Sequence, residues 1–407
     1  MTIGVGGSTP EQELAKMQDM SGGVEFIDNA DRQARLDKAR ALMREQKIDA
    51  LYLDTTVNLN YFTGLNLKLT ERLHGAILPA DGPLVYLSPA FEEPKTRSML
   101  KIDGDIRVWE EHEDPSALVI ETVESLGISA GRLAIDPNAP FFNVDGLRRS
   151  GNRYELVNGA AITGACRAVK TPREVALLQR SNEITLEVHK AAARIMREGI
   201  GTVEVEEFIL EAFRRLGGKA PQAGRPIVLF GEATAYPHGV DYPQSLKDGE
   251  MVLLDLGCFL GDYRSDMTRT YVFGNANARQ REVWDLEKAA QLAGFAAAQL
   301  GAPCEAVDAG ARSLIEAAPG FEKDYKTPGL PHRTGHGIGI EVHEESYIVR
   351  NNKRPLEVGM CFSIEPMICI YGEFGIRLED CAYMADDGVR WFTTPSHSVD
   401  DPFGYEA

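Results

Sequence analysis

The segment that most constrains the fold of this chain is MVLLDLGCFLGDYRSDMTRTYVF, at residues 251–273. It opens with four apolar residues, and Asp255 then stands where a buried strand would carry another Val or Leu. Gly261 and Asp262 form a favourable two-residue hairpin turn, after which a second strand-like run contains Asp266. The pattern predicts an antiparallel β-hairpin with an acidic side chain in each strand.

The turn also predicts the register of this hairpin. If residue 260 faces 263, then Asp255 faces Thr268 and Asp266 faces Gly257. Asp255 and Asp266 would then point to one face as diagonal neighbours, within reach of a shared partner. Two desolvated carboxylates repel each other by about 4 kcal/mol at ~4 Å in an effective dielectric of about 20. We therefore expect a positive charge between them.

Composition excludes several classes of protein. The 407 residues are 43% hydrophobic and 26% charged, which is typical of a globular chain with two domains. The formal net charge of −18, without a cluster of Lys and Arg, argues against nucleic acid or an anionic membrane as a partner. No apolar run approaches the ~18 residues of a membrane span, and the N-terminus lacks the basic and apolar parts of a signal peptide.

The cysteines indicate a reducing compartment. The six cysteines are scattered along the chain, and none forms a CxxC pair. Small buried thiols in a reduced protein explain this pattern better than a disulfide framework does. We expect a cytoplasmic protein.

Alternating strand-like and helical segments predict a small α/β domain over residues 1–165, in which residues 1 to about 25 form a loosely ordered arm. The sequence KTPRE at 170–174 is typical of a helix start, so we place a second domain at 166–407. Its predicted helices lie at 172–198, 203–216, 278–300 and 305–317. Its predicted strands lie at 226–230, 251–257, 263–273, 360–365, 376–384 and 389–393, joined by hairpins. This pattern predicts an α+β domain with antiparallel sheet.

A glycine-rich segment in the second domain, PHRTGHGIGIEVHEE at 331–345, carries several histidines. His332 and His336 are four residues apart, but the glycines around them make a helix improbable. We expect a glycine-rich turn that lets one imidazole, that of His336, approach another group closely.

Two apolar segments near the C-terminus also contain charged residues. MCFSIEPMICI at 360–370 places Glu365 at the end of a strand, and GIRLEDCAYM at 375–384 places Arg377 and Glu379 on one strand face. Taken singly, either glutamate could form a salt bridge at a strand end.

Counted together, these residues favour a metal site. Four carboxylates and one imidazole on or beside predicted core strands have only Arg269 and Arg377 as nearby cations in sequence. Two divalent ions balance four negative charges, and oxygen-rich ligation with one nitrogen suits manganese, cobalt, zinc or iron. A bridged pair of such ions about 3.5–4 Å apart commonly activates water and holds a scissile carbonyl.

The motifs DLG…YRSDMTRT, HRTGHGIGIEVHE, SIEP and GIRLED, in this order, resemble the pita-bread metallopeptidases, the family of methionine aminopeptidase, aminopeptidase P and prolidase. AYPHG at 235–239 is similar to the family's upstream histidine motif. RLDKARALMREQKIDALYL and NLNYFTG resemble the creatinase-type N-terminal domain, which methionine aminopeptidases lack. The segments FGEATAYPHG, WEEHEDP and PGLPHRTGHG are similar to segments of short bacterial Xaa-Pro dipeptidases.

This resemblance implies a C-terminal pita-bread domain behind a smaller α/β creatinase-type domain. It also implies hydrolysis of the Xaa-Pro bond in a dipeptide or short peptide, and a homodimer. The implied cofactors are two divalent metal ions, with manganese as the first candidate and zinc, cobalt or iron as others. The implied metal ligands are Asp255, Asp266, His336, Glu365 and Glu379.

The resemblance further implies individual roles. Asp266 and Glu379 would bridge the two ions, and Glu365 would also be the general base for the bridging water. His343 and His238 would contact the substrate, stabilise the oxyanion and position the proline residue.

Two more residues would support this site. Arg377 would either hold a ligand or bind the substrate carboxylate, and Thr268 would buttress the ligands. His343, His238, Arg377 and Thr268 could each be ordinary scaffold instead.

One position departs from the family pattern. Many members carry Tyr five residues after the first metal-binding Asp, where this chain has Leu260, so metal affinity or preference could differ. Cys258 is a conceivable soft replacement ligand, but its side chain should point to the face opposite Asp255.

Three other functions are alternatives to hydrolysis of the Xaa-Pro bond. A metal-dependent dimethylsulfoniopropionate lyase uses the same fold with slightly different ligand spacing. Creatinase uses it without metals, but all five ligands are intact here. A catalytically inactive binding module would be expected to lose ligands and gain a basic tail, and this chain does neither.

Overall fold

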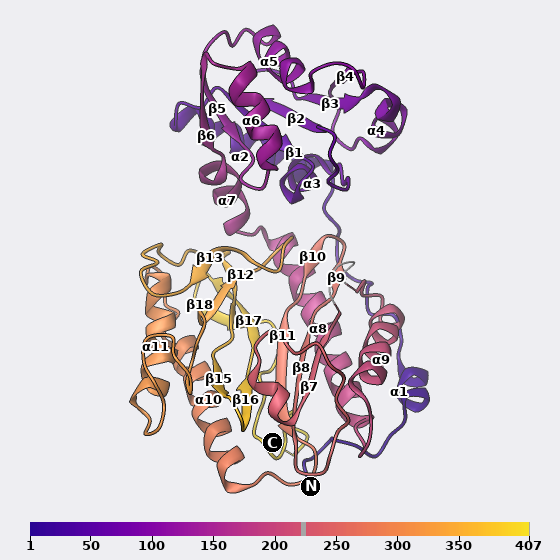
Figure 1. Cartoon of the computed structure of the whole chain (residues 1–407), viewed down its shortest axis with the longest axis vertical. Helices are drawn as coiled ribbons and strands as arrows, with labels where there is room; N and C mark the ends of the chain where they lie inside the picture. Colours follow the sequence, from indigo (N-terminus) through magenta and orange to yellow (C-terminus); the bar gives the residue numbers. More distant parts are fainter. Residues whose placement is uncertain (221–224, 407) are drawn as a thin grey trace. The chain divides into compact units, whose positions relative to one another are not determined.

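The computed structural model describes residues 1–220 and 225–406. It divides into two compact units, one comprising Ile27–Arg167 and the other comprising Met1–Phe26 with Ala168–Ala407 (Figure 1). The first 26 residues, which we predicted to belong to the N-terminal domain, are thus part of the larger unit. Within the described residues, no helix has the length and apolar character needed to cross a membrane.

The unit at Ile27–Arg167 is built on one mixed sheet with the strand order β4-β3-β2-β1-β5-β6. Strand β1 pairs antiparallel with β2 and parallel with β5. The two outer pairs of the sheet, β3 with β4 and β5 with β6, are parallel. The strands are β1 (Ala50–Asp54), β2 (Gly75–Pro79), β3 (Val85–Pro89), β4 (Asp105–Trp109), β5 (Gly131–Ile135) and β6 (Tyr154–Asn158). The helices are α2 (Asn29–Glu45), α3 (Val57–Thr63), α4 (Glu93–Met99), α5 (Pro115–Ser125), α6 (Phe141–Ser150) and α7 (Ala160–Ala168).

The N-terminal segment is not the loosely ordered arm that we expected. It contains α1 (Pro10–Lys16), and the backbone N–H of Gly6 donates to the carbonyl of Ala193 at 2.9 Å. Glu13 is buried and forms an ion pair with Arg194. No local pattern predicts these contacts, because their partners lie far along the chain; Glu13 and Arg194 are 181 residues apart.

The larger unit has the predicted α+β character, with antiparallel strand pairs between helices. In Figure 1, α10 and α11 lie to one side of its strands and α8 and α9 to the other. The helices are α8 (Pro172–Arg194), α9 (Thr202–Arg215), α10 (Ala278–Ala297) and α11 (Cys304–Ala317). The strands are β7 (Ile227–Phe230), β8 (Met251–Leu256), β9 (Phe259–Leu260), β10 (Tyr263–Arg264), β11 (Met267–Val272), β12 (Gly335–Gly337), β13 (Glu344–Ile348), β14 (Cys361–Ile364), β15 (Met367–Ile370), β16 (Phe374–Arg377), β17 (Asp380–Ala385) and β18 (Gly388–Trp391).

These strands form several small sheets. One has the order β11-β8-β7, one has the order β13-β12-β14-β17-β18, and β15 pairs with β16. The predicted helix boundaries are close to those observed. The exception is α8, which ends at Arg194 rather than near residue 198.

The hairpin register predicted from the turn is confirmed. Tyr263 pairs with Leu260 and Thr268 pairs with Asp255. Gly261 adopts a φ of 61°, the left-handed conformation that such a turn requires and that glycine adopts without strain.

Packing on β8 determines the face of the strand from which Asp255 projects. Val252 and Leu254 belong to a core cluster with residues of α8 and α9. Met251 and Leu253 face the other way and pack with residues of α10, β15 and β16. Because side chains alternate along a strand, Asp255 lies on the same face as Leu253.

The glycine-rich segment forms a strand, β12, where we predicted a turn. Its glycines are required by the close approach of the neighbouring strands. A Cβ on Gly335 would lie 2.0 Å from the carbonyl oxygen of Ser363, and one on Gly337 would lie 2.4 Å from that of Glu345. His336 stands between these two glycines and is thereby held in the middle of the sheet.

A buried ion pair ties β11 to β17 behind these strands. The Arg269 guanidinium and the Asp380 carboxylate are both fully buried, with Nη2 and Oδ1 2.7 Å apart. Nη1 of Arg269 also donates to the carbonyl of Glu379 at 2.9 Å, and Gln291 donates to Asp380.

Replacing Arg269 by methionine should therefore lower the free energy of unfolding by about 3–5 kcal/mol, because Asp380 would keep a buried, uncompensated charge. Thermal denaturation of the R269M variant measures this. R390M, which breaks an exposed ion pair with Asp387, is the matched control and should melt close to wild type. Equal melting of R269M and R390M would contradict this role of the buried pair.

Candidate metal centre

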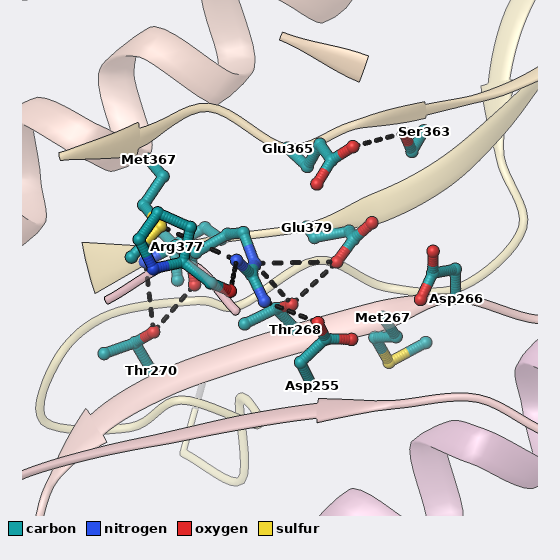
Figure 2. Close-up of polar contacts among 12 residues, drawn as sticks. Asp255, Asp266, Met267, Thr268, Thr270, Ser363, Glu365, Met367, Arg377 and Glu379 are labelled. Atoms are coloured by element: carbon teal, nitrogen blue, oxygen red, sulfur yellow. Dashed lines mark hydrogen bonds and ion pairs between the residues drawn. The ribbon is translucent and has the colours of Figure 1, made fainter. Parts of the chain in front are cut away.

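The structure brings the five predicted metal ligands to one cavity of about 210 Å³. Figure 2 shows Asp255 and Glu379 beside the guanidinium of Arg377, with Asp266 and Glu365 farther from it. The five predicted ligands come from five places in the fold: β8, the residue before β11, β12, the residue after β14 and the link between β16 and β17. The residues at these places are Asp255, Asp266, His336, Glu365 and Glu379.

Three of the five lie close enough to share one ion. One ligand atom each from Asp266, His336 and Glu379 can be chosen so that all three lie within 4.8 Å of one another. Nε2 of His336 is 3.6 Å from Oδ2 of Asp266 and 3.0 Å from Oε1 of Glu365. Nδ1 of His336 lies 3.1 Å from the carbonyl oxygen of Gly337. Since a carbonyl only accepts, Nδ1 donates there, and Nε2 can present its lone pair to the carboxylate side.

Arg377 and Thr268 connect the carboxylates (Figure 2). Arg377 is 4% exposed, and its Nη2 donates to Oδ2 of Asp255. Its Nε donates to the hydroxyl of Thr268 at 2.9 Å, and its Nη1 to the carbonyl of Pro237 at 3.0 Å. The Thr268 hydroxyl in turn donates to Oε2 of Glu379 at 2.6 Å. Every nitrogen of the guanidinium is thus engaged with the protein.

Glu379 has one oxygen left over. Its Oε1 is buried, and among the residues that the structure describes no group donates a hydrogen bond to it. A buried carboxylate oxygen without a donor needs a proton or a cation, because its desolvation is otherwise uncompensated. Burial, together with the charge of Asp266, raises the pKa of Glu379 well above its usual range.

The other carboxylates respond to the same crowding. Burial and the neighbouring charge of Asp255 raise the pKa of Asp266 to about 8. Burial also raises the pKa of Asp255, against the opposing effect of Arg377. Burial acts in the same direction on Glu365, but the charge and hydrogen bond of His336, together with the charges of His332 and Arg377, outweigh it and lower the pKa of Glu365 to about 2. Oxygen ligands in excess, with one imidazole nitrogen, fit a divalent ion such as manganese, zinc, cobalt or iron.

The two histidines predicted to contact substrate line the same cavity. The ring centroid of His343 lies 4.3 Å from that of His336, with the rings 77° apart. Burial and the charge of His336 lower the pKa of His343 to about 4, so its ring is neutral at neutral pH. His238 reaches the cavity from the segment after β7, next to Pro237.

Two residues near the site were not singled out from the sequence. Nε2 of His332 is buried without a hydrogen-bond partner among the described residues, and burial lowers the pKa of this ring. Its spacing from His336 was the available signal, which we considered only for a helix. Arg264 lines the cavity from β10, and no pattern marked it.

Leu260, the one position that departs from the family pattern, and the nearby Cys258 lie away from the cavity. Leu260 and Cys258 are both buried, and neither is among the residues that line it. The Cys258 thiol lies beside the hydroxyls of Thr185 and Ser265, and burial raises its pKa to about 11.

Comparison with known proteins agrees with the resemblance seen in the motifs. The family model for metallopeptidase family M24 matches residues 176–386, and that for the creatinase/prolidase N-terminal domain matches residues 35–169. An Xaa-Pro dipeptidase of Lactobacillus helveticus is 30% identical over 88% of this chain and 96% of its own length. Two crystal structures are also similar. Dipeptidase PepE from Mycobacterium ulcerans has a TM-score of 0.85 and 29% identity, covering 92% of this chain and 99% of that one. Prolidase from Thermococcus sibiricus has a TM-score of 0.81 and 29% identity, covering 91% and 98%.

The raised pKa of Asp266 predicts how the metal-free protein responds to pH. A carboxyl whose folded pKa is about 8, against 3.8 in the unfolded chain, favours the folded state less as pH rises through that interval. His343, with its lowered pKa, acts in the opposite direction only below its ordinary pKa of 6.5. Glu365, whose pKa is lowered to about 2, loses its contribution only below 4.5. The melting temperature should therefore fall between pH 6.5 and pH 8.

The fall in melting temperature between pH 6.5 and pH 8 should be smaller in D266N, which has no proton to lose at this position. Thermal melts in the presence of a chelator at both pH values measure it, with D386N, which removes an exposed acid, as the control. If D266N and D386N declined as steeply as each other, Asp266 would not be the group that titrates.

Proposed function

This chain belongs to metallopeptidase family M24, and on that premise we propose that it hydrolyses the Xaa-Pro bond of dipeptides or short peptides. The observation that carries this proposal is the convergence of four carboxylates and one imidazole on a single cavity that is also lined by two further histidines. The substrate would be a small peptide with proline at its second position. On the basis of the family we also propose a cytoplasmic homodimer.

We assign the ligands of two divalent ions, with manganese as the first candidate, to the five clustered residues. Asp266 and Glu379 are the bridging pair in this proposal, supported by the unsatisfied buried oxygen of Glu379 and by the raised pKa of both carboxyls. When bound, such ions would lower the pKa of water and polarise the substrate carbonyl. The ligands are Asp255, Asp266, His336, Glu365 and Glu379.

Glu365 is the proposed general base. Its carboxylate lines the cavity, with Oε1 3.0 Å from Nε2 of His336, and from there it can accept a proton from the attacking water. The Ser363 hydroxyl donates to its Oε1 at 3.2 Å and helps to fix its orientation. The same carboxyl can then return the proton to the proline nitrogen as this nitrogen leaves.

His343 and His238 are the proposed substrate contacts. Because His343 is neutral at neutral pH, it can donate a hydrogen bond to a developing oxyanion without bringing a second positive charge next to His336. His238 directly follows Pro237, whose carbonyl accepts from Arg377, and both residues line the cavity. In this proposal His238 contacts the proline residue of the substrate.

Arg377 and Thr268 are proposed as positioning residues. Of the two roles considered for Arg377, the orientation of Asp255 is favoured, because all of its nitrogens already have partners in the protein. Thr268 accepts from Arg377 and donates to Glu379, so it sets the direction in which the free oxygen of Glu379 points.

Activity on Ala-Pro tests the proposal most simply. Wild-type protein supplied with manganese should hydrolyse Ala-Pro, and E365Q should reduce kcat by about 10²–10⁴-fold, because glutamine cannot take up the proton. E373Q, which removes an exposed glutamate paired with Arg279, is the control and should keep full activity. Metal content measured on each sample separates loss of the base from loss of an ion. Unchanged kcat in E365Q would remove Glu365 as the base.

Replacing Thr268 by valine should weaken metal binding by about 10- to 100-fold, since the shape is kept while Glu379 and Arg377 lose their shared hydroxyl. Titration of chelated protein with manganese measures this affinity. The control is T122V in the other unit, which removes a buried hydroxyl that donates to Leu118 at 2.7 Å. If T268V bound metal as tightly as T122V, Thr268 would be ordinary scaffold.

The lyase alternative receives no support from the relatives described above, which are peptidases. An assay with dimethylsulfoniopropionate beside Ala-Pro separates the two reactions directly.

A further inference from the structure

One arginine that lines the cavity, Arg264, has no anionic partner among the residues that the structure describes. Arg264 lies on β10, and its Nε is buried without a hydrogen-bond partner among the described residues. Within the same described part of the chain, no carboxylate oxygen lies within 4.0 Å of its guanidinium. The guanidinium carbon lies 5.2 Å from the centroid of the Phe259 ring. The side chain is partly exposed toward the cavity that it lines.

The other two arginines of the cavity lining are already committed. Arg377 holds Asp255, Thr268 and the carbonyl of Pro237. Arg225 forms an ion pair with Glu206, at 3.1 Å. Arg264 therefore differs from both in having donors that the described residues leave unused.

The acids of the site do not account for Arg264 either. Its charge acts on Asp255 and Asp266 from a distance, but it pairs with neither. Ions bound to these carboxylates would neutralise them further, and the charge of Arg264 would then act on whatever else enters the cavity.

We infer that Arg264 is the docking group for a carboxylate of the peptide substrate. This inference rests on the proposed function and adds a specificity determinant to it. A guanidinium suits this task because its planar fork can donate two parallel hydrogen bonds to one carboxylate. An Xaa-Pro peptide offers two such groups: the C-terminal carboxylate of a dipeptide, and the side chain of an acidic residue before the proline.

The hairpin itself does not depend on this side chain. The backbone N–H of Arg264 donates to the carbonyl of Gly339 at 2.8 Å, and the backbone pairs with Phe259 across β9 and β10. Variants at this position should therefore fold, and their effect on catalysis can be measured.

The test compares wild type, R264Q and R264K on matched substrates. Ala-Pro against Ala-Pro-amide isolates the C-terminal carboxylate, and Glu-Pro-amide against Gln-Pro-amide isolates the acidic side chain. R264Q should raise KM about 10- to 100-fold for the substrate that carries the recognised carboxylate, and should leave the uncharged partner of that pair within about twofold. R264K should restore part of the loss. A C-terminal result would favour a dipeptidase over an aminopeptidase.

R225Q is the matched control, because it removes an arginine that lines the same cavity but already has a carboxylate partner. It should not change the ratio of KM values within either pair. Calorimetric titration of Ala-Pro and Ala-Pro-amide into E365Q and into E365Q/R264Q measures the same contrast without turnover. Failure of the wild type to hydrolyse any of the peptides would therefore be a separate result, directed at the proposed function. An equal effect of R264Q on charged and uncharged peptides, in rate and in calorimetry, would overturn the inference and leave Arg264 as a counter-charge for the acids.

Discussion

The mutual repulsion of buried carboxylates is the constraint on which this structure depends. Four acids meet in one cavity, and burial together with the charges of the neighbouring acids raises the pKa of Asp255, Asp266 and Glu379. Arg377 and Thr268 offset part of the cost by holding Asp255 and Glu379 in fixed directions. The remaining excess of negative charge is what makes the cavity suited to divalent cations.

The fold supplies the rigidity that such an arrangement needs. The acids come from strands of different sheets, and their positions are set by strand pairing, by the close approach that Gly335 and Gly337 allow, and by the buried pair of Arg269 and Asp380. The same strands are packed by apolar clusters with helices on both sides. A destabilised sheet would let the carboxylates move apart, so the stability of the fold and the geometry of the site are linked.

Much of this could be predicted from the sequence, because the deciding signals were local. A two-residue turn at Gly261 fixed the register that places Thr268 opposite Asp255, and acidic residues inside apolar strands marked the site. What was missed depends on long-range contacts. The N-terminal segment is ordered by residues far along the chain, and the glycines of β12 match strands that only the folded sheet brings near. The roles of Arg264 and His332 depend on the groups that surround them in three dimensions, which the four-residue spacing of His332 from His336 does not show.

The number of divalent ions bound per chain, followed together with Ala-Pro hydrolysis as chelated protein is reloaded with manganese, tests the central claim most directly. The account predicts an inactive protein after chelation and activity that grows as occupancy approaches about two ions per chain, one for each pair of negative charges. A preparation that remains fully active while free of bound ions would contradict it.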